Sequence, residues 1–337
     1  MIEDSPREQS RAKIRSLRYR ISKLQNGFIL LLLSIFLIFS GCSGVLLRNW
    51  PQSQEYMPDR YVLNSVQFYP QKAFQCGPSA LAMALEWSGV PSNPEALAPE
   101  VFTPSRKGSL QSAIIAASRR HGRVAYPVSG PDALLAEISA GHPVIVLQNL
   151  GLSWFPTWHY AVVIGYDLRK GVMVLHSGIT PRKQISLKVF EYTWARSDHW
   201  GLLVLPPSQL PATATEHEYI SAILGLEKTG QWKAAVKGYE TALNRWPDSL
   251  LAYIGLGNSY YTLGDLESAK KTFQEAIRRY PTEGSAYNNL AEVLKKQGKN
   301  QEALKAAYKA VELGGPLANE YQKTLEEIQS LNSMKKN

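Results

Sequence analysis

A single cysteine, Cys76, stands where an apolar segment with helical spacing begins. A thiol at a helix N-terminus faces unpaired backbone amides and the positive end of the helix dipole, which lower its pKa and favour the nucleophilic thiolate. Gly77 permits close approach of a substrate, and Pro78 suits the first helical turn. These residue types indicate a nucleophile, and an inert buried cysteine is the alternative.

A nucleophilic thiol needs a base, and His159 is the best placed of the six histidines. It precedes the β-branched segment 161–164, which predicts a strand that can hold an imidazole at a sheet edge. A surface histidine beside the loop 154–158 is the alternative. No pair of histidines has ligand spacing near Cys76 or a carboxylate cluster, so we expect neither a metal nor another cofactor.

The residue that orients His159 depends on strand register. Asp167 lies eight residues along the same strand, roughly 26 Å away, and cannot reach the ring. A hairpin turn over 167–171, centred on residue 169, places residue 179 opposite His159, with Ser177 diagonal on the same face and His176 pointing away. Ser177 is therefore the expected orienting residue, although a β-bulge would shift the choice to His176.

The N-terminus carries a targeting pattern. Seven Lys/Arg precede an apolar run over 28–39, which ends in a Ser-Gly-Cys sequence at Cys42. This pattern resembles a bacterial lipobox, whose cysteine is lipidated and becomes the mature N-terminus; an uncleaved membrane anchor over 28–47 is the alternative. Both interpretations place the rest of the chain outside the inner membrane. Ser43 resembles an outer-membrane sorting signal, so we expect a lipoprotein that faces the periplasm.

Charge and cysteine count exclude two classes of protein. Seven basic and three acidic residues lie in 1–41, so four of the nine excess positive charges belong to the leader. No later Lys/Arg cluster is interleaved with aromatics, which argues against a nucleic-acid partner. Cys42 and Cys76 are the only cysteines, so there is no disulfide framework, and lipidation of Cys42 would leave Cys76 as the only thiol.

Composition predicts two domains after a leader at 1–42. The proline-rich segment 206–216 predicts a linker between 57–205 and 217–332. In the first domain, helical patterns after Cys76 precede strand-like patterns; the helices are expected at 76–89, 110–120 and 131–140, and the strands at 143–147, 159–166, 172–176 and 202–205. Helices followed by antiparallel strands define an α+β fold.

The second domain repeats with a period of 34 residues. The repeated positions are Tyr219, Tyr253 and Tyr287; Ala235, Ala269 and Ala303; Ala242, Ala276 and Ala310; and Gly230, Gly264 and Gly298. The pattern resembles the tetratricopeptide repeat, an all-α module of paired helices, with residues 318–332 as a capping helix. Such repeats hold a protein segment on their concave face, so the resemblance implies a protein partner there.

Three segments of the first domain resemble the papain-like cysteine peptidases, and most closely the C39-like group: Gln71 with the residues that follow Cys76, the segment 159–167, and the segment 174–178. The resemblance implies a papain-like fold in which Cys76 attacks, His159 is its base and Gln71 helps to form the oxyanion hole. Gln75 is the alternative to Gln71. The Asp-Pro that orients the histidine in that group is absent here.

The resemblance leaves three functions open. The first is cleavage of an amide bond in a protein or peptide of the cell envelope, with the repeats recruiting a partner. The second is a binding or assembly lipoprotein that has kept the fold and lost turnover, which the missing Asp favours. The third is acyl transfer by the same thiol.

Overall fold

The structure, a computed structural model, describes residues 57–334. Residues 51–337 form one compact unit of the chain. The leader 1–42 and the predicted lipidation site Cys42 lie outside the described residues, so their roles stay predictions. Within residues 57–334, none of the helices has the length and hydrophobicity needed to span a bilayer.

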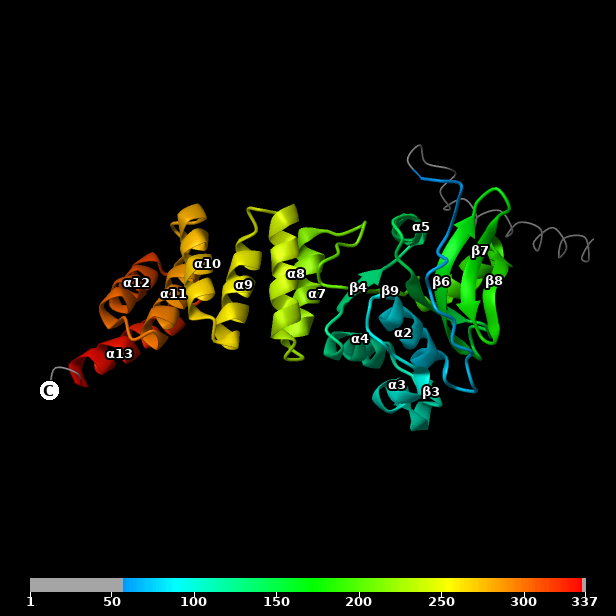
Figure 1. The fold of residues 1–337 in the computed structure, drawn as a ribbon, viewed down its shortest axis with the longest axis horizontal. Helices are drawn as coiled ribbons and strands as arrows, with labels where there is room; N and C mark the ends of the chain where they lie inside the picture. Colours follow the sequence, from blue (N-terminus) through cyan, green and yellow to red (C-terminus); the bar gives the residue numbers. More distant parts are fainter. Residues whose placement is uncertain (1–56, 335–337) are drawn as a thin grey trace, which may run out of the picture. The chain divides into compact units, whose positions relative to one another are not determined.

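The first part of the described chain mixes helices and strands (Figure 1). Its strands are β1 (Arg60–Val62), β2 (Phe102–Thr103), β3 (Gly108–Ser109), β4 (Val124–Val128), β5 (Val144–Asn149), β6 (Trp158–Asp167), β7 (Val172–Ser177), β8 (Thr180–Ser186) and β9 (Gly201–Leu205). Its helices are α2 (Cys76–Trp87), α3 (Pro94–Val101), η1 (Pro104–Arg106), α4 (Gln111–Arg120), α5 (Pro131–Ser139), α6 (Leu187–Trp194) and η2 (Ala195–Ser197). The predicted α+β class is confirmed.

Seven of these strands form one antiparallel sheet in the order β4-β9-β5-β6-β7-β8. β5 pairs with the first half of β6. β1 pairs with the C-terminal end of β6, along the same edge of that strand as β5. Every residue of β5 is buried, because helices cover both faces of the sheet: α2 packs on one face, and α5 and α6 contact the same strands from the other side. β6 therefore pairs with β5 or β1 on one side along most of its length, and with β7 on the other side only from Val162 to Asp167.

Helix α2 forms the centre of the core. Its residues from Gly77 to Leu85 are all buried, which follows from their small or apolar side chains. They pack against alternate residues of the sheet, among them Ile145, Val162 and Leu202. The helix ends at Trp87, two residues before Gly89, whose φ of +87° suits a glycine at a helix end.

The β6–β7 hairpin differs from the predicted one at its turn. Next to the turn Asp167 pairs with Val172, which is offset by one residue from the expected register. An irregularity between Val163 and Gly165 removes this offset, so that Val162 pairs with His176 as predicted. Near His159 the pairing of β6 with β7 is thus the expected one, because the bulge compensates for the shift at the turn.

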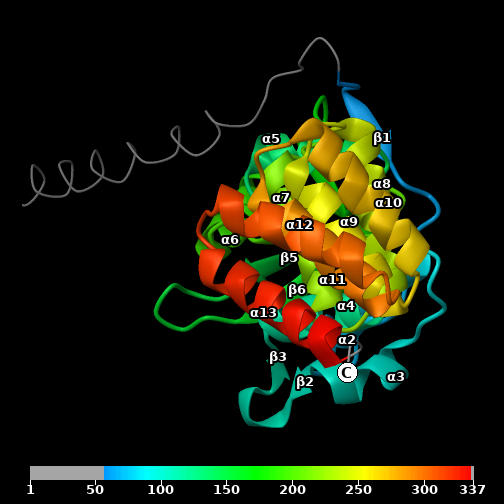
Figure 2. The ribbon, with the colours of Figure 1, turned by 90° about the vertical axis from the view of Figure 1, so that its left-hand side faces the viewer.

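The second part of the described chain is all-helical. Its helices are α7 (Glu216–Glu227), α8 (Trp232–Arg245), α9 (Leu250–Leu263), α10 (Leu266–Arg279), α11 (Gly284–Lys296), α12 (Asn300–Leu313) and α13 (Ala318–Met334). The repeated alanines are buried between paired helices, where Gly255 and Gly257 also lie against the rings of Tyr239 and Phe273. Figure 2 shows α13 lying along α11 and α12, which it contacts. This confirms the predicted repeat architecture with a capping helix.

Segment 206–216, predicted as a linker, is hydrogen-bonded to the first part of the chain. The buried carboxylate of Glu137 accepts hydrogen bonds from the backbone N–H groups of Ala212 and Thr213 at 3.0 and 2.8 Å, and from the Thr213 hydroxyl at 2.6 Å. His142 Nδ1 lies 2.7 Å from the same carboxylate. We call Glu137, His142, Ala212 and Thr213 the Glu137 cluster. Whether the two parts fold separately stays a prediction.

Candidate active site

Cys76 is the first residue of α2, as the sequence predicts. The turn that leads into the helix contains Phe74 in a left-handed conformation, with a φ of +63°. Gly77 lies so close to Ser109 that an added Cβ atom would come within 2.2 Å of the Ser109 hydroxyl. A side chain at position 77 would therefore displace β3 from the start of the helix. Close packing against Ser109 thus requires a glycine here, in addition to the substrate access predicted from the sequence.

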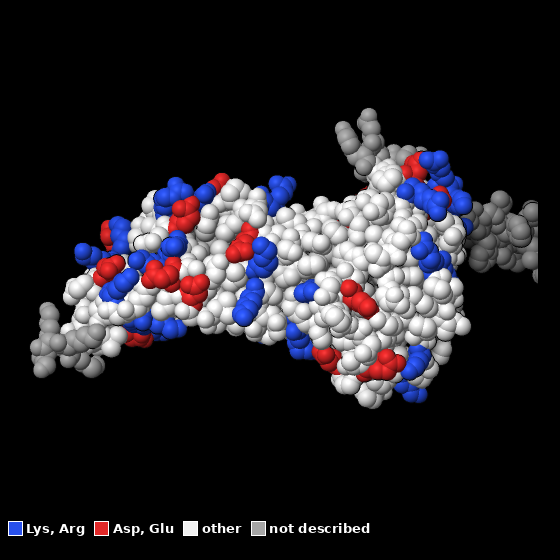
Figure 3. Space-filling model, viewed as in Figure 1, with Lys and Arg blue, Asp and Glu red and all other residues white. Residues whose placement is uncertain are grey.

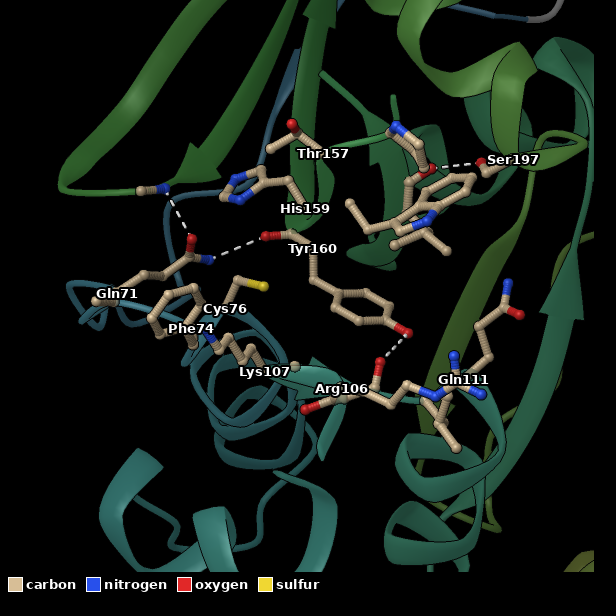
Figure 4. A pocket seen from close by; sticks show the side chains of 18 of the residues that line it. Gln71, Phe74, Cys76, Arg106, Lys107, Gln111, Thr157, His159, Tyr160 and Ser197 are labelled. Atoms are coloured by element: carbon tan, nitrogen blue, oxygen red, sulfur yellow. Dashed lines mark hydrogen bonds between the residues drawn. The ribbon is translucent and has the colours of Figure 1, made fainter. Parts of the chain in front are cut away.

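His159 is the second residue of β6, and its Nε2 lies 2.9 Å from Ser177 Oγ. Among the described residues no hydrogen-bond partner is found for Nδ1. If Nε2 carries the proton and donates it to Ser177, the Nδ1 lone pair is the one that can accept a proton from a thiol. Figure 4 shows the imidazole above Cys76, and both residues line the same cavity.

His176, the alternative orienting residue, points away from His159. It is buried with Nε2 3.1 Å from the Val66 carbonyl, and its Nδ1 accepts a hydrogen bond from the Arg182 backbone N–H. Its ring also lies 5.2 Å from that of Phe68. The geometry thus brings Ser177, and not His176, to His159; the catalytic role of Ser177 stays a prediction.

Gln71 bridges strand β6 and the turn between β7 and β8, beside the thiol. Its Nε2 donates to the Tyr160 carbonyl, and its Oε1 accepts from the Gly178 N–H, both at 3.0 Å. The Gln71 backbone N–H donates to the Gly178 carbonyl at 3.0 Å. One Nε2 hydrogen has no partner among the described residues, so the predicted oxyanion donor has one hydrogen bond left to give.

The backbone of Tyr160 is a part of the site that the sequence analysis missed. The β6–β7 pairing extends only to Val162 and His176, which leaves the backbone groups of Tyr160 free to meet other partners. Its carbonyl accepts from Gln71, and a backbone hydrogen bond from Tyr160 stabilises the thiolate form of Cys76. The only sequence signal was its position next to His159.

Burial dominates the titration of both reacting groups. It raises the pKa of the Cys76 thiol above its ordinary value, although backbone hydrogen bonds of Tyr160, Gly77 and Cys76 act in the opposite direction. The prediction that the helix start lowers this pKa is therefore wrong in net effect. Burial, and to a smaller extent the charge of Lys183, lower the pKa of His159 to about 4. At neutral pH the resting pair is a neutral thiol and a neutral imidazole.

The side chains of Gln71, Cys76 and His159 line a cavity of about 880 Å³. Its other walls come from three segments: 106–111, 156–158 and 196–198. The lining includes four cationic side chains, Lys72, Arg106, Lys107 and Arg196, against one carboxylate, Asp198. No group of three His, Cys, Asp or Glu residues suited to a metal ion is found among the residues that the structure describes. The cavity is large enough for several residues of a peptide.

The comparisons with known proteins agree with this architecture. Residues 63–199 match the Peptidase_C39 like family, and residues 222–269 and 254–318 match the tetratricopeptide repeat. The chain therefore combines a C39-like peptidase domain with tetratricopeptide repeats. No curated protein sequence matches it.

Several solved structures resemble parts of the chain. A Bacillus anthracis protein described as a C39-like peptidase is 17% identical, with a TM-score of 0.37, and the match covers 43% of this chain and 97% of that one. The type III secretion chaperone SycD of Yersinia enterocolitica, in complex with a peptide of the translocator YopD, is 19% identical with a TM-score of 0.33, covering 34% and 93%. The first repeat domain of Spaghetti, bound to an HSP90 peptide, is 18% identical with a TM-score of 0.33, covering 35% and 93%.

Proposed function

We propose that the protein is a thiol-dependent peptidase that cleaves an amide bond in a protein or peptide of the bacterial cell envelope. The observation that carries the proposal is the position of His159, whose Nε2 lies 2.9 Å from Ser177 Oγ and whose side chain lines the same cavity as Cys76. The membership of this domain in the C39-like peptidase family supports it.

In the first step, the Cys76 sulfur attacks the substrate carbonyl carbon while the thiol proton passes to His159 Nδ1. The free Nε2 hydrogen of Gln71 donates to the oxyanion. The protonated imidazole then gives its proton to the leaving amine, and a thioester remains. Water, deprotonated by His159, hydrolyses the thioester and regenerates the thiol. Ser177 accepts the Nε2–H throughout and keeps Nδ1 directed at the reacting atoms.

A non-catalytic binding protein is the second candidate function, and two observations favour it. Burial disfavours both charged forms of the pair. His159 contacts a neutral hydroxyl, where a carboxylate would stabilise the imidazolium formed during reaction. In this alternative the cavity binds a peptide without cleaving it.

We further propose that the repeats bind a protein partner and that the N-terminal segment attaches the chain to a membrane, through a lipid on Cys42 or an uncleaved anchor. The basic and apolar leader supports attachment. The tetratricopeptide match supports partner binding. Over the repeat helices, the face in Figure 3 carries charges of both signs side by side, as on an ordinary soluble surface.

A peptide-library digest tests the peptidase. Incubation of the full chain with the library, followed by mass spectrometry, should give new peptide ends that the Cys76→Ala variant does not produce. In the same digest with a primary amine added, products that carry this amine at the new C-terminus would identify acyl transfer. If the wild type binds library peptides but yields the same masses as Cys76→Ala, the domain is a binding module.

A further inference from the structure

The loop between β5 and β6 presents apolar side chains to solvent. In residues 150–157, Trp154 and Phe155 are 79% and 75% exposed, and Leu150 and Leu152 are about half exposed. No Lys, Arg, Asp or Glu occurs between residues 143 and 166. Single exposed apolar residues are common, but four within six residues mark a contact surface.

The loop is rigidly built, so the exposure of its tip does not result from missing contacts. Leu150 N–H donates to the Thr157 carbonyl at 2.9 Å, and the backbones of Leu152 and Phe155 exchange hydrogen bonds at 3.1 and 3.2 Å. The Asn149 side-chain oxygen accepts from the N–H groups of Gly151 and Thr157. This bonding holds the two aromatic residues at the tip of a short hairpin.

The apolar surface continues onto helix α6. Arg196 donates to the carbonyls of Asn149 and Gly151 while its guanidinium stacks 4.0 Å from the centre of the Tyr192 ring. Tyr192 and its neighbour on the helix, Val189, are each 53% exposed. We call Leu150, Leu152, Trp154, Phe155, Val189 and Tyr192 the apolar patch. The one carboxylate of α6, Glu191, is buried, whereas Lys188 is exposed.

We propose that the apolar patch inserts into the interfacial layer of the membrane to which the N-terminal segment attaches the chain. Trp, Tyr and Phe side chains favour this layer, and a surface without carboxylates but with an exposed lysine suits anionic headgroups. The inference rests on the membrane attachment proposed above. It does not depend on whether Cys76 is catalytic.

The length of the tether permits this contact. The described chain joins the sheet through β1, at the end of β6 opposite to the loop, and the ten residues of β6 span about 30 Å. Fourteen residues lie between Cys42 and Met57, and they reach at most about 50 Å. An anchor at Cys42 therefore allows the loop to face the same bilayer.

Docking through the patch has a consequence for the substrate. Pro156, Thr157 and Trp158, at the base of the loop, line the cavity that holds Cys76. Insertion of the tip would place the cavity entrance beside the bilayer surface. The substrate class that this geometry selects is a peptide segment of a membrane-attached protein, close to the lipid headgroups.

A tethered fragment tests the docking. Residues 51–337 form a compact unit with their own hydrophobic cores, and Cys76 is the only cysteine in it. With Cys76→Ser and Leu152→Cys, the fragment carries one thiol for an environment-sensitive NBD label. An N-terminal histidine tag holds it on vesicles with nickel-chelating and anionic lipids. The matched control carries the label through Leu251→Cys in α9, where the leucine is 57% exposed.

Lipid-bound nitroxides should quench the emission of the label at position 152 and leave the label at 251 unchanged. Adding Trp154→Ser and Phe155→Ser should remove the quenching at 152, with circular dichroism confirming that the variant stays folded. Equal quenching at both positions, or none at 152, would refute the docking. A blue shift without vesicles, together with a doubled mass, would show that a second copy covers the patch, and would also refute it.

Discussion

Two buried polar clusters of the molecule differ in how completely their hydrogen bonds are satisfied. In the Glu137 cluster the carboxylate is fully buried and accepts from two backbone N–H groups, a hydroxyl and a histidine. In the Cys76 site, His159 Nδ1 and one hydrogen of Gln71 Nε2 have no partner among the described residues. Both oxygens of the Glu137 carboxylate are bonded within the fold, whereas the free groups of the second cluster belong to residues that line a cavity.

This difference separates a structural role from a chemical one. A polar group that lines a cavity without a protein partner can bond to a ligand or substrate, whereas a buried group must find its partners within the fold. The Glu137 cluster should therefore govern stability and the junction with the repeats. The Cys76 site should govern turnover and contribute little to stability.

The largest expected effect is on chemistry. Cys76→Ala should reduce peptide cleavage below detection, because it removes the covalent route altogether. The same variant should change the unfolding free energy little, since a half-buried thiol is replaced by a slightly smaller group. Mass spectrometry of a digested peptide library and urea unfolding measure the two quantities. Equal cleavage by both proteins would remove Cys76 from the mechanism.

The next effect is on stability. Glu137→Ala should lower the unfolding free energy by about 4 kcal/mol, because it leaves three donors and His142 without their buried acceptor. Glu302→Ala, at an exposed position in α12, is the matched control and should stay within about 0.5 kcal/mol of the wild type. Cleavage at a temperature where both variants are folded should be unchanged. A stable Glu137→Ala protein would mean that the junction is held elsewhere.

The Glu137 cluster should also weaken in acid. Burial raises the pKa of the Glu137 carboxyl, but its hydrogen bonds with His142, Thr213 and Ala212 together outweigh burial and hold the pKa below the ordinary value of 4.5. The stabilisation is therefore present above the unfolded-state pKa and is lost as the pH falls through the folded-state value. Protection of the Thr213 amide against hydrogen exchange should decrease in that window before the helices of the repeats unfold. Protection that is independent of pH would argue that the carboxylate does not hold the segment.

His159 should make folding pH-dependent in a different range. Its pKa is about 4 in the folded protein against an ordinary value of 6.5, so below pH 6.5 the unfolded chain binds a proton that the folded chain does not. Stability should fall by about 3 kcal/mol between pH 6.5 and 4 because of this residue. The difference between wild type and His159→Gln isolates the contribution. If the two proteins have the same slope, the imidazole is not buried in its neutral form.

The smallest effect concerns the orienting residue. Ser177→Ala should lower turnover about fivefold, the equivalent of about 1 kcal/mol, because a hydrogen bond between neutral groups is lost. Ser177→Asp should preserve or raise turnover and raise the pKa of His159, since a carboxylate stabilises the imidazolium. His176→Ala should reduce stability, as its buried ring packs on Phe68, but should spare turnover. The opposite pattern would assign the orienting role to His176.

Local sequence patterns predicted the elements that position the site. The helix start at Cys76 and the strand that carries His159 follow from apolar spacing and β-branched residues, which act over a few neighbours. Strand β8 was missed because its Lys and Arg side chains are exposed and show no apolar alternation. The contacts of Glu137 were missed because they join residues 75 positions apart, which no local pattern records.

The chemistry of the site was harder to predict than its location. The helix-start argument concerns the immediate neighbours of Cys76, but the pKa of its thiol depends mainly on burial by the sheet, which is a tertiary property. The shifted hairpin turn and the bulge that compensates it likewise required the whole sheet. The prediction that Ser177 lies beside His159 holds because the bulge restores the register that the shifted turn had changed.

The most direct test of a functional Cys76–His159 pair is the rate of Cys76 alkylation by iodoacetamide between pH 4 and 10, in the wild type and in His159→Ala. Because His159 Nδ1 can accept the thiol proton, the folded wild type should react at neutral pH several-fold faster than the variant. This advantage should disappear as the pH falls toward 4, where His159 becomes protonated. Two identical profiles that rise only above pH 9, or labelling only after denaturation, would show an isolated buried thiol and would contradict the proposed active site.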